Sequence, residues 1–239
     1  MAEPTNADTS PSSVAAPGVT VTANGPLLVS GAVPLLRRRA VRSEHGEPLT
    51  WDTTERFRAR EGYALCRCGQ SGRKPYCDGS HNHGFVAEDS AGDGYDERST
   101  VLGGTGITVR DDRSICVHAG FCGNRVTNVW KQVRNTDDST VRAEVIAMVE
   151  RCPSGALTYR FDDHDVEPLF PLAISVIDDG PLWVTGEIPV TIEGSGAALE
   201  TRNRVTLCRC GASGNKPLCD GSHQESGFRD PAPAPAPDA

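Results

Sequence analysis

Short apolar runs, each bounded by glycine or proline, dominate the first part of the chain. VTVTA occupies residues 19–23, NGPLLVSGAVPL occupies residues 24–35, and YALC leads into Cys66. Runs of this length, rich in β-branched residues and interrupted by Gly and Pro, are typical of short strands joined by tight turns. The pattern therefore predicts strands in hairpins, followed by a loop that begins at a cysteine.

The same pattern returns near the other end of the chain. AISVI, DGPLWVTGEIPV and VTLC repeat the earlier runs in the same order. The two copies are offset by 155 residues at their Gly-Pro pairs and by 142 residues at their cysteine loops. The first copy therefore carries 13 extra residues, which we place around residues 37–50. We interpret its arginine-rich stretch, residues 37–42, as a solvated part of this insertion.

A different pattern fills the middle of the chain. GITVR and ALTYR, at residues 106–110 and 156–160, predict two strands that can pair. Between them, Val141, Val145 and Met148 have the i, i+4, i+7 spacing of an amphipathic helix. An aspartate or serine at its start can cap this helix, and the Cys-Pro after it ends it.

Composition favours small modules over one large core. The 239 residues include 25 Gly and 17 Pro, and small turn-rich modules usually need a staple such as a metal. We predict an α+β, mostly β protein in which two similar units of strands and loop flank a small middle module. The expected boundaries are a disordered tail at 1–18, unit 1 at 19–87, the middle module at 104–161, unit 2 at 173–229, and a disordered Pro/Ala tail at 230–239.

Charge and hydropathy argue against two classes of partner. The net charge is −8, so the chain lacks the broad basic footprint of a nucleic-acid-binding protein. The N-terminal MAEPTNADTS has no signal-peptide pattern, and the longest mostly apolar stretch, PLLVSGAVPLL, has 11 residues. A membrane-spanning helix needs about 20 apolar residues. We expect no nucleic-acid partner and no membrane partner.

The cysteines indicate metal binding. There are nine, an odd number, and they fall into three clusters of three and not into pairs. In each copy of the repeat two cysteines are separated by one residue, which suits two ligands of one metal better than two disulfides. We therefore expect a cytoplasmic protein, in a reducing compartment where thiols remain free to bind metal.

The repeated loop offers four donors for one site in each unit. CRCGQSGRKPYCDGSH and CRCGASGNKPLCDGSH are identical at 13 of 16 positions, and each has the spacing Cys-x-Cys-x8-Cys-x3-His. Zinc accepts three thiolates and one imidazole, and a [2Fe–2S] cluster takes two protein ligands on each iron. The spacing favours iron–sulfur and leaves zinc open. The expected ligands are Cys66, Cys68, Cys77 and His81 in site 1, and Cys208, Cys210, Cys219 and His223 in site 2.

The two copies also distinguish ligands from their neighbours. His83 is a rival ligand, but its nearest counterpart in the second loop is Glu225, whereas His81 matches His223. The supporting residues we expect around the sites are Ser71, Asp78, Ser213 and Asp220. The aspartates can cap the turn that holds the imidazole. The serine hydroxyls can either donate to cluster sulfur or stabilise a turn.

The motif CRCGxSxxKPxCDGSH resembles the CDGSH iron–sulfur domain family, the mitoNEET-like or NEET proteins. Both copies match at all four ligand positions, and with their strands the resemblance covers residues 20–87 and 173–229. It implies a β-cap and a cluster lobe with a [2Fe–2S] cluster in each unit. It assigns the Cys-x-Cys pair to the inner iron and the third cysteine with the histidine to the outer iron. Since two such units commonly pack about a two-fold axis, we expect an intrachain pseudo-dimer and a monomeric protein.

The middle module has a third set of donors, site 3, formed by Cys116, Cys122 and Cys152. The strings CVHAGFC and RCPSGALTY resemble the divergent single-cluster 4Fe–4S ferredoxin-like domain over residues 104–161. The resemblance implies a third cluster. Three cysteines fit a [3Fe–4S] cluster, or a [4Fe–4S] cluster with one other ligand, for which His118 is the nearest candidate.

Electron transfer through several iron–sulfur clusters is the function that we expect, with redox proteins or apo cluster acceptors as partners. Storage and transfer of labile clusters is a second possibility, and a zinc-stapled interaction module is a third. The sequence has no nucleophile–base pattern, P-loop or dinucleotide fingerprint, so we expect an electron carrier and not an enzyme.

Overall fold

Three small sheets and a few helices make up the computed structural model, which describes residues 15–230. Most of the two tails that we expected to be disordered, residues 1–14 and 231–239, lies outside this range. Among the described residues, no helix combines the length and the apolar character that crossing a membrane requires. The α+β, mostly β fold class is confirmed.

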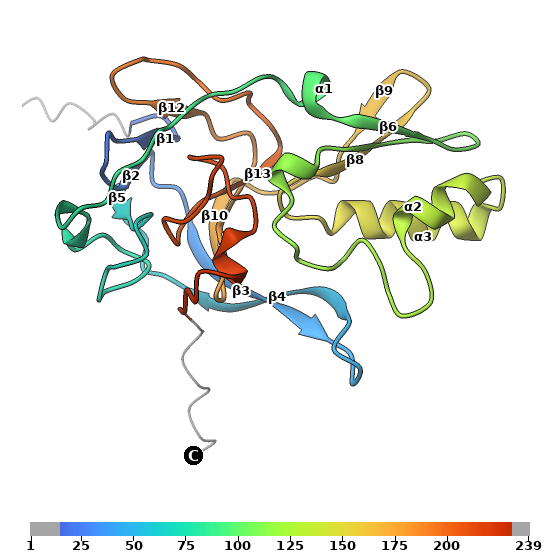
Figure 1. Cartoon of the computed structure of the whole chain (residues 1–239), viewed down its shortest axis with the longest axis horizontal. Helices are drawn as coiled ribbons and strands as arrows, with labels where there is room; N and C mark the ends of the chain where they lie inside the picture. Colours follow the sequence, from blue (N-terminus) through green and yellow to red (C-terminus); the bar gives the residue numbers. More distant parts are fainter. Residues whose placement is uncertain (1–14, 231–239) are drawn as a thin grey trace, which may run out of the picture.

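Two of the sheets each combine strands of both units. The first sheet contains, in order, β12 (Val190–Ile192), β1 (Gly18–Val21), β2 (Leu27–Ser30) and β5 (Gly62–Leu65). The second contains β13 (Arg204–Leu207), β11 (Leu182–Thr185), β10 (Ala173–Ile177), β3 (Leu35–Arg42) and β4 (Pro48–Arg56). Unit 1 thus has three strands in the first sheet and adds β3 and β4 to the second, whereas unit 2 has three strands in the second sheet and adds β12 to the first. Figure 1 shows β3 and β10 side by side in the centre of the molecule.

The strand pairings between the two units occur at equivalent positions of the internal repeat. Val19 of β1 pairs in parallel with Val190 of β12, and Ile174 of β10 pairs in parallel with Leu35 of β3. The second pairing is the first with the two units interchanged, at the offset of 155 residues between the repeats. This register confirms the predicted intrachain pseudo-dimer.

One hydrophobic core serves both units. Its side chains come from strands of both sheets and from both copies, among them Val21, Leu27 and Leu65 of unit 1 and Ile174, Leu182 and Leu207 of unit 2. Burial of such side chains contributes about 1.5–3 kcal/mol each. Because the core is shared, we expect neither unit to be stable alone.

The 13 extra residues of unit 1 form the hairpin of β3 and β4, close to the predicted position. The interpretation of residues 37–42 as solvated is wrong for Arg37. Its side chain is buried and forms ion pairs with Glu55 of β4, with Asp178 of unit 2, and with Asp230, the residue that directly follows unit 2. The exchange of β3 into the second sheet carries this arginine into the interface between the units, where unit 2 and the residue after it supply the matching carboxylates.

The middle module has its own sheet and core. The sheet contains β6 (Thr100–Gly103), β7 (Thr108–Asp111), β8 (Leu157–Phe161) and β9 (His164–Val166) in that order. The two predicted strands, β7 and β8, pair as expected, and the predicted helix is α3 (Ser139–Glu150). The edge strands β6 and β9 are short and largely exposed, so they left little hydrophobic pattern to detect.

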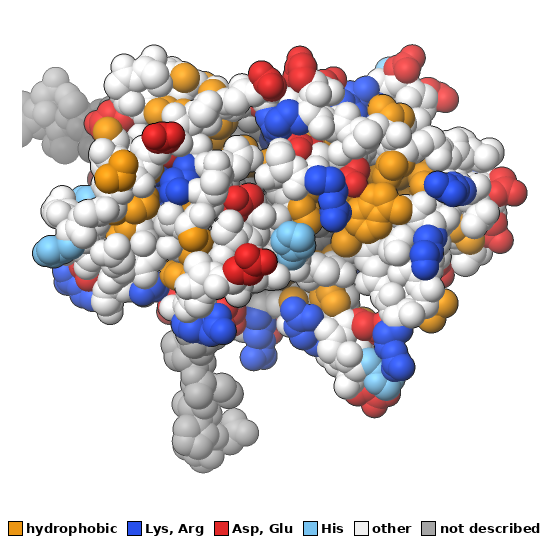
Figure 2. Space-filling view, viewed as in Figure 1, with side chains coloured by type: hydrophobic (Ala, Val, Ile, Leu, Met, Phe, Trp, Pro, Cys, Tyr) orange, Lys and Arg blue, Asp and Glu red, His pale blue; other side chains and the backbone are white. Residues whose placement is uncertain are grey.

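A helix cap, two short helices and four 3-10 turns complete the fold of residues 15–230. The Asp138 carboxylate accepts hydrogen bonds from the N–H groups of Thr140 and Val141 at the start of α3. The short helices are α1 (Tyr95–Arg98) and α2 (Val129–Gln132), with 3-10 turns η1 (Ser80–Asn82), η2 (Arg113–Ile115), η3 (Val133–Asn135) and η4 (Ser222–Gln224). Figure 2 shows acidic and basic side chains interspersed over one face, and a hydrophobic patch over the middle module.

Candidate metal centres

Each repeated loop folds back on the last strand of its unit. In unit 1 the Cys66 N–H donates to Pro75 O at 2.9 Å, and the Cys77 N–H donates to Ala64 O at 2.9 Å. Unit 2 repeats these bonds at Cys208 and Cys219. Since β5 and β13 are fixed by the shared core, the hydrogen bonds hold the first and third cysteines of each loop against a rigid support.

The four expected donors of each loop form two close pairs. The Sγ atoms of the Cys-x-Cys pair are 3.6 Å apart in site 1 and 3.8 Å apart in site 2. The third cysteine Sγ lies 3.3 Å from Nδ1 of His81 in site 1 and 3.4 Å from Nδ1 of His223 in site 2. On one tetrahedral ion with metal–sulfur bonds of about 2.3 Å, two thiolates lie about 3.8 Å apart, and a thiolate and an imidazole nitrogen about 3.5 Å.

The pairs therefore have the spacing of two ligands on one metal. Among residues 15–230, however, no three His, Cys, Asp or Glu side chains are grouped to hold a single metal ion. A mononuclear zinc site needs all four donors around one ion, whereas a binuclear cluster needs one pair for each iron. The donor geometry fits the binuclear case.

Asp78 and Asp220 fix the turn that carries the histidine. Asp78 accepts hydrogen bonds from the Ser80 N–H and hydroxyl through one oxygen and from the Gly72 N–H through the other. These bonds, chiefly the one from the Ser80 hydroxyl, lower the pKa of Asp78. Asp220 makes the same three bonds in unit 2. Each aspartate thus ties the histidine turn to the preceding part of its loop.

The serines and the rival histidine have other partners. The Ser71 hydroxyl donates to Tyr76 O at 2.7 Å, and the Ser213 hydroxyl donates to Leu218 O at 2.7 Å. Of the two roles left open, the hydroxyls take the turn role. His83 is exposed, and its Nδ1 lies 3.3 Å from Ser80 O, not beside a cysteine.

Sequence reasoning missed a buried arginine between the first two cysteines of each loop. Arg67 donates to the carbonyls of Gly25 and Thr22 and forms an ion pair with Asp89. Arg209 makes the equivalent bonds to Gly180, Ile177 and Asp230, so both loops are tied to the β1–β2 or β10–β11 turn. The invariant Arg of the two Cys-Arg-Cys strings was the available signal.

The two cluster loops meet across the pseudo-two-fold axis. Gly69 has a φ of 78° and packs on the Cys210 carbonyl, and Gly211 has a φ of 83° and packs on the Cys68 carbonyl. A β-carbon on Gly211 would lie 2.7 Å from Cys68 O, and one on Gly69 would overlap Cys210 O. Glycine at both positions therefore permits sites 1 and 2 to approach each other closely.

Site 3 lines an apolar cavity of about 210 Å³ in the middle module. Cys116, Cys122 and Cys152 all contribute to its wall, together with Phe121 and Leu157. This volume is several times the roughly 30 Å³ of one water molecule. Burial raises the pKa of Cys116, and burial and then the neighbouring Cys152 and Cys116 raise the pKa of Cys122 to about 11. Three thiolates in such a cavity need a cationic group between them, and the residues fit an iron–sulfur cluster.

Three charged or titratable side chains besides the cysteines line the site 3 cavity, namely Asp111, Arg113 and His118. His118 has a φ of 54°, and its ring packs on Gly221 of unit 2. Asp111, at the end of β7, is 6% exposed. Its Oδ2 accepts a hydrogen bond from Trp130 Nε1 at 2.8 Å, while Oδ1 is buried and has no partner among the described residues. Asp111 lies outside the cysteine strings, so no motif signalled it.

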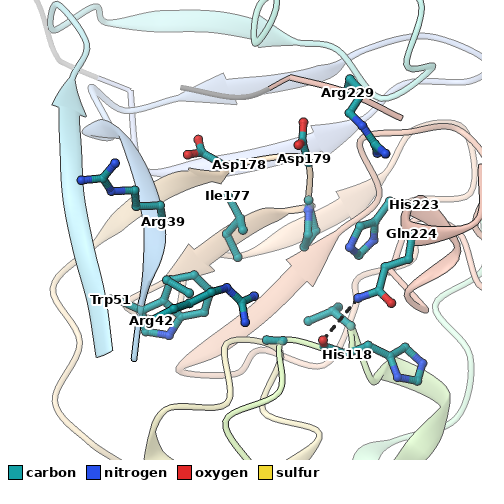
Figure 3. Close-up of a pocket in the computed structure, with 15 residues that line it drawn as sticks. Arg39, Arg42, Trp51, His118, Ile177, Asp178, Asp179, His223, Gln224 and Arg229 are labelled. Carbon is teal, nitrogen blue, oxygen red and sulfur yellow. Dashed lines mark hydrogen bonds between the residues drawn. The ribbon is translucent and has the colours of Figure 1, made fainter. Parts of the chain in front are cut away.

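Site 3 directly adjoins site 2. A β-carbon on Gly221, between Cys219 and His223, would lie 3.1 Å from Cys116 O and would overlap the His118 ring. Gln224 Nε2 donates to His118 O at 3.3 Å, and Asn215 Nδ2 donates to Ser114 O at 3.2 Å. His118 and His223 both line one cavity of about 500 Å³. Figure 3 shows these residues and the hydrogen bond from Gln224 to the His118 backbone.

The middle module is held in this position from two sides. Arg204 of β13, 1% exposed, donates to the carbonyls of Val149, Glu150 and Cys152 at the end of α3 and to Leu157 O. From the unit 1 hairpin, Trp51 Nε1 donates to Arg151 O at 3.1 Å, and the Trp51 ring centroid lies 4.9 Å from that of Phe121. The extra residues of unit 1 thus help to fix site 3.

Comparison with protein families agrees with this description. The family described as "Iron-binding zinc finger CDGSH type" matches two segments, residues 24–82 and 179–224. The family described as "Divergent 4Fe-4S mono-cluster" matches residues 102–162. Searches of curated proteins and of solved structures gave no significant match. The chain is an iron–sulfur protein in which a divergent 4Fe-4S mono-cluster segment lies between two segments of the CDGSH family.

Proposed function

We propose that this protein carries single electrons between a site in its middle module and a pair of CDGSH sites. The observation that supports this most strongly is the direct contact between the Cys219–His223 turn and the Cys116–His118 loop. A chain that merely used metals as staples would gain nothing from packing two ligand loops against each other. Placed in contact, the loops bring two redox centres together.

The proposed ligands follow from the donor pairs. Cys66 with Cys68, and Cys77 with His81, hold the two irons of a [2Fe–2S] cluster in site 1. Cys208, Cys210, Cys219 and His223 do the same in site 2. Site 3 holds a third cluster through its three cysteines. When bound, such clusters supply one-electron redox chemistry, and a histidine ligand in place of cysteine raises the potential.

Buried charges and hydrogen-bonded turns of the chain support the two CDGSH sites. Arg67 and Arg209 place a buried positive charge beside each loop, and the hydrogen-bonded turns of Asp78 and Asp220 keep the imidazole beside the third cysteine. Both carboxylates that line the cavity of about 500 Å³ beside site 2 already have partners. Asp178 forms an ion pair with Arg37, and Asp179 accepts a hydrogen bond from the Asp230 N–H. This favours a carrier over an enzyme.

Cluster storage and transfer is a second candidate, and the exposure of site 1 favours it. Cys77 and His81 are half-buried and accessible on the surface, so a partner protein can reach this turn. The proposed partner is therefore a redox protein, or an apo protein that accepts a cluster, that docks on the exposed turn of unit 1 in a reducing compartment such as the cytoplasm.

Redox titration and cluster transfer separate the two candidates. We expect purified protein to be reduced and reoxidised repeatedly with no loss of iron or acid-labile sulfide. Incubation with an apo-ferredoxin at neutral pH should leave the clusters in place. Rapid transfer together with poor redox reversibility would favour the second candidate. A colourless protein that contains zinc would contradict both.

A further inference from the structure

We propose that Asp111 is the fourth protein ligand of the site 3 cluster, which is then a [4Fe–4S] cluster held by three cysteines and one carboxylate. This assignment rests on the proposed function in so far as site 3 must hold a cluster. It differs from the expectation from sequence, in which His118 was the nearest candidate.

The position of Asp111 is the first argument. It is the last residue of β7, and its side chain lines the same cavity as Cys116, Cys122 and Cys152. The strand pairing of Asp111 with Leu157 of β8, another cavity residue, fixes its backbone at the cavity wall. The carboxylate therefore lines the same cavity as all three cysteines.

The unused oxygen of Asp111 is the second argument. Trp130 Nε1 donates to Oδ2, and this bond fixes the plane of the carboxylate. Oδ1 is buried and is without a hydrogen-bond partner in residues 15–230. A buried polar atom left without a partner costs about 1–3 kcal/mol. Coordination of iron by Oδ1 removes this cost and leaves the Trp130 hydrogen bond intact, an arrangement common for metal-bound carboxylates.

His118 is the weaker candidate because, although it lines the cavity, the residue is exposed and its ring lies against unit 2. The ring packs on Gly221 of the site 2 turn, at the junction between the two sites. Its backbone carbonyl accepts the hydrogen bond from Gln224, which holds the residue in that place. His118 therefore serves as a contact between site 3 and site 2, and Asp111 as a ligand within site 3.

The test is to change each candidate in the full chain and to identify the cluster by its iron content and electron paramagnetic resonance (EPR). Oxidised [2Fe–2S] and [4Fe–4S] clusters are silent, whereas an oxidised [3Fe–4S] cluster gives a signal. We expect oxidised wild-type protein to be silent and to hold roughly eight irons per chain, two for each CDGSH site and four for site 3. D111A should show a [3Fe–4S] signal and lose one iron.

Two variants make the result specific. D111C supplies a thiolate at the same place, and it should restore the silent oxidised state and lower the potential of site 3. H118A should remain silent with the iron content of wild type. In all variants the EPR signals of the reduced CDGSH sites report whether the chain is folded.

Three results would overturn the assignment. One is a [3Fe–4S] signal from H118A while D111A remains silent. The second is a full [3Fe–4S] signal from wild type that D111A does not change, which would show that site 3 has no fourth ligand. The third is wild-type protein with roughly four irons per chain. This last result would remove site 3 from the proposed function too, whereas the first two would leave that function standing.

Discussion

The two CDGSH units carry nearly the same loop in different surroundings. In unit 1, Cys77 and His81 are half-buried, and the turn between them faces outward. In unit 2, Cys219 and His223 are buried, His223 to 7% exposure, because the middle module packs on that turn. The same motif thus forms one accessible site and one enclosed site, with no change in its four expected ligand residues.

A few unmatched residues produce this difference. Arg204, which binds the end of α3, stands where unit 1 has Gly62. Asn215, which donates to Ser114 O, stands where unit 1 has Arg73. Positions at which the two copies differ therefore indicate what each unit contacts, whereas the expected ligands are among the identical positions. We interpret site 2 as the connection to site 3, and site 1 as the exit toward a partner.

The largest effect should come from removing the arginine that holds the middle module. R204M leaves several buried carbonyl groups without a donor, and we expect it to lower the free energy of unfolding by about 3–5 kcal/mol. Chemical denaturation of the holoprotein measures this. R39M is the matched control, since that side chain is 55% exposed, and it should change stability by less than about 0.5 kcal/mol. Equal effects of the two substitutions would contradict the role of Arg204 in docking.

Iron loss to a chelator should distinguish the two sites directly. C68A removes site 1 and leaves site 2 to be observed, and C210A does the reverse. We expect site 2 to lose its cluster about tenfold more slowly, because the chelator reaches it only when the middle module is displaced. A displacement that costs about 1.4 kcal/mol gives this factor. Visible absorbance at pH 7 measures both rates. Equal rates would show that the middle module does not protect site 2.

As the pH is lowered, site 1 should lose its cluster before site 2, the same order as in the chelator experiment. Burial, with smaller effects from Arg209 and His118, lowers the pKa of His223. Only neutral imidazole binds metal, so as the pH falls below the ordinary histidine pKa of about 6.5, His223 stays able to bind. Site 2 in C68A should therefore keep its visible absorbance to lower pH than site 1 in C210A. Loss at the same pH, or earlier loss from site 2, would contradict this.

The smallest effect concerns a single hydrogen bond. N215A removes the bond to Ser114 O, worth about 0.5–1.5 kcal/mol, and should speed iron loss from site 2 by about two- to tenfold. R73A changes the equivalent exposed position in unit 1 and should leave the rate at site 1 unchanged. The same chelator assay, in the C68A and C210A backgrounds, compares the two. Faster iron loss from site 1 in R73A, without faster iron loss from site 2 in N215A, would contradict this prediction.

Much of this organisation was predictable from sequence, because local patterns determine it. The repeat located the strands, the 13-residue hairpin and the two sets of donors, and Cys-Arg-Cys spacing and turn chemistry are short-range properties. Asp111, the proposed ligand, and Arg204 were missed because neither belongs to a motif, and their surroundings are formed by residues distant in sequence that packing brings together. Arg37 was misjudged for the same reason, since the exchange of β3 places it against unit 2.

The most direct test of the account is the magnetic interaction between site 3 and each CDGSH site in fully reduced protein. When two paramagnetic clusters are close, their EPR signals broaden or split. In C68A, where site 2 remains beside site 3, we predict a clear interaction between the two signals. In C210A, where only site 1 remains, we predict signals that are independent or much more weakly coupled. Equal coupling in the two variants, or stronger coupling in C210A, would contradict the proposal that site 2 connects site 3 to the rest of the molecule.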